Sequence, residues 1–480
     1  MKLLSILSIF IFSFGSANAQ GFKVTLEAPQ YQEGIAYLIY YFGKNMNVED
    51  SAAVNAKGVA VFQKNEKIKP GVYSIVFPGK NRLYDFLIDK EQSIQIKAPD
   101  TSNLLEKTIV TGSKENVLFQ NYQKTAAEKG ALMQKEIEAF KASASRADST
   151  QHERNYQAIN NELNQYREGI ITNNSSSMLA SLLTAMKEPQ VLHPRPQTRK
   201  DSIENYQHYK KHFWDGITFM DDRIIRTPFF LPKLERYFRE VVSPAPDSTI
   251  KDMEYLILLS RSNPEMYKFL LNWLTDEYIN PKYMGQDKVF VHLFEKYHSK
   301  GLTNWLNEKQ LTAISNRAYM VMSNLIGEKA ANIEMTNIAG AKSPLYNIKA
   351  NYTVVAFWDP SCGHCRTEMP RMDSLYKARW KKEGVKIYAV LSEIKEKENW
   401  VNFIKEHKMD EWTNVFETEE QRKAVENAKT PSYKQLYDVI QTPTLYLLDN
   451  EKRIIAKKLT LEQMDEVLQA KIKNTTADTQ

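Results

Sequence analysis

Apolar and polar residues alternate with a period of two from residue 21 to about residue 100. The alternation is clearest at Phe22, Val24 and Leu26, and glycine and proline interrupt it, as at Pro70. Alternation places apolar side chains on one face of a strand, whereas glycine and proline favour the turns between strands. We therefore predict a small antiparallel β domain, similar to a sandwich, over residues 20–100.

The pattern changes to helical periodicity between residues 101 and 326. Charged, heptad-like stretches cover 115–141 and 152–166, and more apolar segments follow at 178–186 and 266–273. Prolines recur in the second half of this region. Proline lacks a main-chain donor and ends or kinks a helix, so these residues divide the region into short helices. We predict an all-α domain here.

Strand-like and helix-like segments alternate in the last part of the chain. The pattern predicts a strand at 354–358, a helix at 362–377, a strand at 385–391 and a helix at 398–407. A hairpin of two strands, at 444–448 and 453–456, and a closing helix at 461–472 follow. This order is typical of an α/β domain, which we place at residues 327–480. The predicted fold class of the whole chain is therefore multidomain α+β.

Residues 1–19 have the pattern of a secretory signal peptide. Lys2 supplies a positive charge, residues 3–14 are an apolar run too short to span a bilayer, and Ala17-Asn18-Ala19 fits a small-residue cleavage site. We expect cleavage before Gln20 and a soluble, exported product, periplasmic in a cell with two membranes. No later stretch approaches the roughly 20 apolar residues of a membrane-spanning helix, so we do not expect the mature chain to span one.

The charge balance gives no reason to expect a nucleic-acid partner. The formal net charge is +6 over 480 residues, which is a small excess for so long a chain. Lysine-rich patches of this kind are typical of solvated surface.

Cys362 and Cys365 are the only cysteines of the chain, and Gly363 and His364 separate them. They lie where a predicted buried strand runs into the first turn of a helix. Unpaired N–H groups and the helix dipole favour negative charge there, so the pKa of the Cys362 thiol should lie below the ~8.5 of a free thiol. Cys362 is the predicted nucleophile. Cys365, one turn further along, should be more buried and should resolve a mixed disulfide by attacking Cys362.

Two other interpretations of this cysteine pair are weaker. A structural zinc site needs four nitrogen or sulfur ligands, and the chain has no second cysteine pair. A purely structural disulfide would close too short a loop to restrain the unfolded chain much. We therefore predict a redox-active disulfide that uses neither a metal nor another cofactor.

The last part of the chain resembles the family of exported thiol-disulfide oxidoreductases typified by TlpA and ResA, which have a thioredoxin fold. The positions that carry this resemblance are Trp358, Cys362, Cys365, Glu368, Pro370 and Thr442-Pro443. The resemblance implies that Pro370 kinks the helix and that Pro443 is a cis-proline facing the disulfide. It also implies that Thr442, Pro443 and Trp358 form the substrate-binding residues, with main-chain groups before the proline holding an extended peptide.

Two departures within this resemblance modify the chemistry. Thioredoxin has a buried aspartate six residues before the first cysteine, where this chain has Ala356. Glu368 lies one helical turn after Cys365 and is the expected acid or base for it, as in the ResA-like group; the alternative is a solvent-facing carboxylate. His364 matches protein disulfide isomerase and is expected to stabilise the thiolate, unless it is an exposed side chain of small effect.

The rest of the chain resembles modules without assigned chemistry. Residues 21–100 resemble an uncharacterised β module that precedes such thioredoxin domains, and the stretch 213–230 resembles a helical domain of unknown function. The leading hypothesis is an exported oxidoreductase that exchanges disulfides with protein substrates and has a redox partner in the membrane or periplasm. The alternatives are a cell-envelope binding module with the thioredoxin domain as scaffold and, less consistent with a dithiol, a thiol peroxidase.

Overall fold

A computed structural model of the chain describes residues 21–80 and 82–477. The signal peptide predicted at residues 1–19 lies outside the described part. Two compact units are present: one contains the described residues up to Val241 together with Leu259–Met266, and the other contains Val242–Leu258 together with the chain from Tyr267 onward. The predicted α+β fold class is confirmed. Both units contain helices from the region 101–326. The predicted boundaries of three domains, near residues 100 and 326, therefore stay a prediction.

The N-terminal region of the first unit is built from two four-stranded sheets, in the orders β4-β1-β7-β8 and β3-β2-β5-β6. The strands are β1 (Phe22–Glu27), β2 (Ile35–Phe42), β3 (Asn45–Ala53), β4 (Val59–Lys64), β5 (Gly71–Val76), β6 (Leu83–Ile88), β7 (Ser93–Lys97) and β8 (Ile109–Thr111). All neighbours pair antiparallel except β1 and β7, which are parallel. The alternating residues, such as Val24 and Ile96, form one buried core shared by the sheets.

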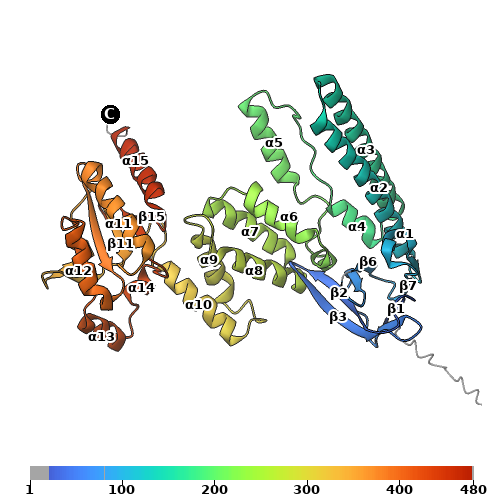
Figure 1. The fold of residues 1–480 in the computed structure, drawn as a ribbon, viewed down its shortest axis with the longest axis horizontal. Coiled ribbons are helices and arrows are strands. Elements are labelled where there is room, and N and C mark those ends of the chain that lie inside the picture. Colours follow the sequence, from blue (N-terminus) through green and yellow to red (C-terminus); the bar gives the residue numbers. More distant parts are fainter. Residues whose placement is uncertain (1–20, 81, 478–480) are drawn as a thin grey trace, which may run out of the picture. The chain divides into compact units, whose positions relative to one another are not determined.

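Helices cover the outer face of the second sheet, which explains why β5 is apolar on both faces. Val72 of β5 and Leu87 of β6 pack against Leu179 and other buried side chains of the helices. The helices of this first part are α1 (Leu104–Lys107), α2 (Lys114–Ala142), α3 (Arg146–Asn173), α4 (Met178–Ala185), α5 (Arg199–His212) and α6 (Phe230–Arg236). The long helices α2 and α3 lie side by side (Figure 1).

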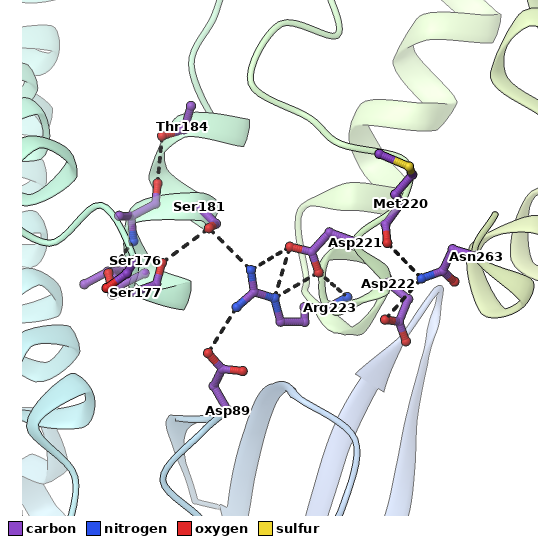
Figure 2. A network of polar contacts seen from close by, with 12 residues as sticks. Asp89, Ser176, Ser177, Ser181, Thr184, Met220, Asp221, Asp222, Arg223 and Asn263 are labelled. Carbon is purple, nitrogen blue, oxygen red and sulfur yellow. Dashed lines mark hydrogen bonds and ion pairs between the residues drawn. The ribbon is translucent and has the colours of Figure 1, made fainter. Parts of the chain in front are cut away.

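A polar network joins the β strands to these helices. Figure 2 shows Arg223 between three partners: it binds Asp221 through two nitrogens, Asp89 after β6 over 3.0 Å, and Ser181 of α4 over 3.5 Å. The Asp89 side chain is 8% exposed, and a buried carboxylate needs such a partner because desolvation disfavours its charge. The network therefore fixes the β strands and α4 as parts of one unit.

The second unit begins with helices and continues into the C-terminal sheet. Its helical part includes residues of α7 (Pro246–Ser260) and α8 (Pro264–Tyr278), with α9 (Asp287–Leu293) and α10 (Glu308–Met322). Across the described residues, none of the helices is both long and apolar enough to cross a membrane.

The C-terminal sheet has seven strands in the order β10-β9-β13-β12-β11-β14-β15. The strands are β9 (Glu334–Asn337), β10 (Lys342–Pro344), β11 (Tyr352–Trp358), β12 (Val385–Leu391), β13 (Thr413–Phe416), β14 (Thr444–Leu448) and β15 (Ile454–Lys457). β11 pairs parallel with β12 and antiparallel with β14. β11 is therefore a central strand, as its unbroken apolar run predicts.

Both faces of this sheet are covered. One core cluster joins the sheet to α11 (Gly363–Leu375), α12 (Lys397–Glu406) and α15 (Leu461–Ala477), for example through Met369, Trp400 and Met464. The opposite face packs against α14 (Tyr433–Leu436) and the segment before β11. Figure 1 shows α11 close to β11, the strand that precedes it in the chain.

The structure adds elements that the pattern did not predict. β9, β10 and β13 have only three or four residues, too few for alternation to be recognisable, and β8 lies beyond the predicted end of the β domain. α13 (Glu419–Ala428) has only three apolar residues, Ala424, Val425 and Ala428, and none of them is buried, so its apolar periodicity is too weak to predict a helix. The predicted segments around the cysteines agree with the structure to within a few residues.

Candidate active site

The cysteine motif lies at the junction of β11 and α11, as predicted. Cys362 is the N-cap of α11, with φ −78° and ψ 117°, and its sulfur accepts a hydrogen bond from the Cys365 N–H over 3.4 Å. The first helical bond runs from the Arg366 N–H to the Cys362 carbonyl. An N-cap side chain satisfies helix amides that would otherwise lack partners, and a sulfur in that role gains most from them as a thiolate.

The two thiols have different surroundings and opposite pKa shifts. Burial acts to raise the pKa of half-buried Cys362, but hydrogen bonds from Cys365, Thr442 and the His364 N–H outweigh it, so the pKa lies below its ordinary value. Burial, followed by the hydrogen bond with Cys362, raises the pKa of fully buried Cys365 to about 12. Near neutral pH only Cys362 therefore has useful thiolate character.

The second part of the site is the loop before β14. The Thr442–Pro443 peptide bond is cis, which confirms the cis-proline expected from the resemblance. In the thiol form Cys362 Sγ donates a hydrogen bond to the Thr442 carbonyl over 3.2 Å. The fold thus brings the cysteine motif and the proline loop together although 80 residues of sequence separate Cys362 from Thr442.

Asp359 is a site residue that the sequence interpretation missed. It is 4% exposed, and its carboxylate accepts hydrogen bonds from the Ser361 N–H over 3.0 Å, from the Ser361 hydroxyl, and from Thr442 Oγ1 over 3.3 Å. Asp359 therefore ties the turn before Cys362 to the proline loop. The sequence Asp359-Pro360-Ser361 could have indicated this role, because an aspartate in a turn commonly accepts a hydrogen bond from the main-chain N–H two residues later.

Trp358 differs from its expected substrate-binding role. The side chain is fully buried, and its ring packs edge-on against Phe403 with centroids 5.6 Å apart and near Trp400 at 6.3 Å. A fully buried ring cannot contact a substrate directly. Trp358 therefore supports the end of β11 from within the core, and its large apolar surface explains why it lies there.

Glu368 lies one helical turn after Cys365 and is partly exposed. Its carboxylate accepts a hydrogen bond from Arg371 Nη1 over 2.5 Å, and Arg371 also binds Glu462. Ala356 is fully buried in β11, so no carboxylate occupies the thioredoxin position. Glu368 is on the same helix as Cys365, and its acid–base role stays a prediction.

His364 is exposed in the first turn of α11, and its main-chain N–H contributes to the low pKa of Cys362. His364 and Glu368 line the same cleft as Thr442 and Pro443. The tuning role of the imidazole stays a prediction.

Family models match two separate parts of the chain. The sequence model of the AhpC/TSA family matches residues 326–457, and that of a domain of unknown function, DUF4369, matches residues 22–119. The thiol-disulfide oxidoreductase ResA of Bacillus thuringiensis subsp. konkukian is 31% identical over 147 residues, which are 30% of this chain and 76% of that protein. This chain belongs to the ResA family of thiol-disulfide oxidoreductases. The ResA of Bacillus cereus matches with the same identity and coverage.

Solved structures of related domains also match this oxidoreductase. A domain of a possible thiol-disulfide isomerase from Cytophaga hutchinsonii is 32% identical and covers 32% of this chain and 97% of its own, with a TM-score of 0.27. A thioredoxin-like protein from Bacteroides caccae is 19% identical and covers 59% of this chain and 98% of its own, with a TM-score of 0.44.

The opposite pKa shifts predict strongly unequal alkylation of the reduced oxidoreductase. Because the thiolate reacts and its fraction grows as pH rises through the pKa, iodoacetamide should modify Cys362 with a midpoint below that of an ordinary thiol. Cys365 should stay almost unmodified until the pH nears its pKa of about 12. Peptide mass mapping across a pH series measures both. If Cys365 were modified faster than Cys362 in the native protein, the assignment would be contradicted.

Proposed function

We propose that the protein catalyses thiol–disulfide exchange with protein substrates through Cys362 and Cys365. The observation that carries this proposal is the pairing of a half-buried thiol of low pKa, 3.2 Å from the Thr442 carbonyl, with a buried thiol of high pKa one turn away. The exchange needs two groups: a reactive thiolate that attacks the substrate and a second thiol that resolves the mixed disulfide. A scaffold domain would need neither.

Two successive exchange steps transfer electrons from the dithiol to a substrate disulfide. Cys362 loses its proton, its thiolate attacks one sulfur of a substrate disulfide, and the other substrate sulfur leaves as a thiolate that takes up a proton. Cys365 then loses its proton and attacks Cys362 Sγ, which forms the Cys362–Cys365 disulfide and releases the second substrate sulfur as a thiolate that also takes up a proton. The substrate gains two electrons and two protons, and the dithiol loses them; the reverse sequence oxidises a substrate dithiol.

Glu368 is the proposed acid–base group for Cys365 in the second step. A thiol with a pKa of about 12 is almost fully protonated at neutral pH, so its attack requires a base. Burial is the first cause of that high pKa. Glu368 lies one helical turn from Cys365 and lines the cleft that reaches Thr442 and Pro443. It therefore has access to the solvent with which a proton must finally exchange.

Thr442 and Pro443 are the proposed substrate-binding residues. In the described part of the chain, the N–H groups of Gln441 and Thr442 have no hydrogen-bond acceptor. Extended peptides bind to other chains through such free main-chain groups. A substrate segment that binds here would place its sulfur beside Cys362.

We also propose that the protein acts outside the cytoplasm after removal of residues 1–19, with a redox partner in the membrane or periplasm that restores the dithiol or the disulfide. The pattern of Lys2, an apolar run and Ala17-Asn18-Ala19 supports this location. Compartments outside the cytoplasm are where protein disulfides form and persist, so substrates would be present there.

The exchange is tested with single cysteine variants of the full-length protein. Native protein should accelerate the reduction of insulin by dithiothreitol, and Cys362→Ser should abolish the acceleration because it removes the attacking sulfur. Cys365→Ser should instead accumulate a mixed disulfide with the substrate, visible on a non-reducing gel. If native protein with two titratable thiols exchanges no disulfide, the enzyme hypothesis fails and the binding-module hypothesis gains support.

The role of Glu368 is tested by following the two steps separately. When dithionitrobenzoate reacts with reduced protein, the first thionitrobenzoate reports attack by Cys362 and the second reports attack by Cys365. Glu368→Gln should slow the second release at neutral pH by about 100-fold, the lower range for loss of a general base. Glu462→Gln is the matched control, since it removes the other carboxylate that binds Arg371. Equal effects of the two substitutions would mean that Glu368 only holds Arg371.

Export is tested on protein recovered from its native host. N-terminal sequencing of the mature form should begin at Gln20, and the protein should be found in the cell-envelope or periplasmic fraction. A chain that retains Met1 and stays in the cytoplasm would contradict the proposed location.

A further inference from the structure

A large cleft lies between the cysteine site and the helical part of the same unit. It has a volume of about 1150 Å³ and reaches from His364 and Glu368 on α11, across Thr442 and Pro443, to the loop 280–285 before α9. Small-molecule sites typically enclose roughly 300–1,000 Å³, so this cleft is large for such a ligand. Its size and its continuity with the cis-proline loop fit a segment of polypeptide.

The loop 280–285 is held firmly against the C-terminal sheet. Met284 Sδ accepts a hydrogen bond from the Lys457 N–H on β15 over 3.4 Å. Directly after the loop, buried Asp287 of α9 binds the buried ammonium of Lys457, which also donates to the Asn324 carbonyl over 2.6 Å. Desolvated charges are costly unless paired, so this ion pair favours one docked position. The loop is therefore a fixed wall of the cleft.

A second buried ion pair holds the same wall from α10. Arg317 Nη1 binds Asp438 over 2.6 Å, and Asp438 is 1% exposed. Asp438 precedes the proline loop in the chain by a few residues. Arg317 Nε also donates a hydrogen bond to the Ile279 carbonyl, just before the loop 280–285, over 3.2 Å, so Arg317 links the wall to the segment that leads to Thr442.

The wall offers two exposed apolar side chains to a ligand, beside the polar residues Asn280 and Lys282. Tyr283 is 55% exposed and Met284 is 41% exposed, and Ile440, which lines the same cleft next to the proline loop, is 68% exposed. Single exposed apolar residues are common, but three that border one cleft beside a nucleophile mark a binding surface. Several charged side chains of the lining already have partners: Asp287 with Lys457, Asp438 with Arg317 and Lys458, and Glu368 and Glu462 with Arg371.

We propose that Tyr283, with Met284 and Ile440, selects substrates whose cysteine is flanked by apolar residues in an extended segment. The occupant is an unfolded or flexible stretch of a protein substrate. Its main chain would bind the free N–H groups of Gln441 and Thr442, and its apolar side chains would lie on Tyr283 and Ile440. This inference rests on the proposed exchange function and adds the substrate class to it.

The test compares two synthetic peptides of equal length, each with one cysteine carried as a mixed disulfide with thionitrobenzoate. One peptide has leucine and phenylalanine around the cysteine, and the other has serine and glycine. Reduced full-length protein releases thionitrobenzoate, and the ratio of the second-order rate constants measures selectivity. We expect native protein to prefer the apolar peptide and Tyr283→Ser to lower the ratio about tenfold, because burial of the tyrosine ring is lost.

Tyr255→Ser is the matched control, because Tyr255 is also 55% exposed and lies on α7 of the same unit, outside the cleft. It should leave the ratio unchanged, whereas Ile440→Ser, which removes an apolar side chain beside the proline loop, should lower it. The inference is overturned if native protein shows no preference, or if Tyr283→Ser slows both peptides equally. If native protein reduces neither peptide nor dithionitrobenzoate itself, the exchange function fails as well, so the two failures are distinguishable.

Discussion

The antiparallel pairing of β11 with β14 is the constraint on which the site depends. Phe357 of β11 lies opposite Thr444 of β14, so the end of the first strand and the beginning of the second meet at the same edge of the sheet. The cysteine turn leaves that edge and the cis-proline loop enters it. This register is what places the sulfur of Cys362 within hydrogen-bonding distance of the Thr442 carbonyl. A shift by one residue would turn every side chain of β14 to the opposite face.

Helix geometry then makes the two thiols unequal. The N-cap position exposes Cys362 to helix amides and to solvent, whereas the position one turn later directs Cys365 into the core beside the sheet. The same pair of residue types therefore has one low and one raised pKa, and the difference comes from burial and hydrogen bonding. Asp359 contributes by holding the turn and the proline loop together, which preserves the contact between Cys362 and Thr442.

A buried lysine holds the helical part of the second unit against the C-terminal sheet. Lys457 belongs to β15, and burial lowers its pKa even though Asp287 acts in the opposite direction. Its ammonium nevertheless has three oxygen partners, from Asp287 and from the main chain and side chain of Asn324. A buried cation with such specific partners gives the helices one orientation against the sheet, since apolar packing alone is less directional. The cleft beside the dithiol exists because of that docking.

The sequence alone determined the local features of this protein. The unbroken apolar run of β11 and the two cysteines at a helix start are contiguous patterns, and each predicted its element from neighbouring residues, whereas the cis-proline at Pro443 was expected from the family resemblance. Strands of three or four residues, such as β9 and β13, carry too little periodicity to be recognised. Tertiary structure decided the burial of Trp358, the link from Asp359 to Thr442 and the wall formed by Tyr283 and Met284. Each depends on contacts between residues far apart in the chain, and the pattern around one residue contains no information about which distant surface will pack against it.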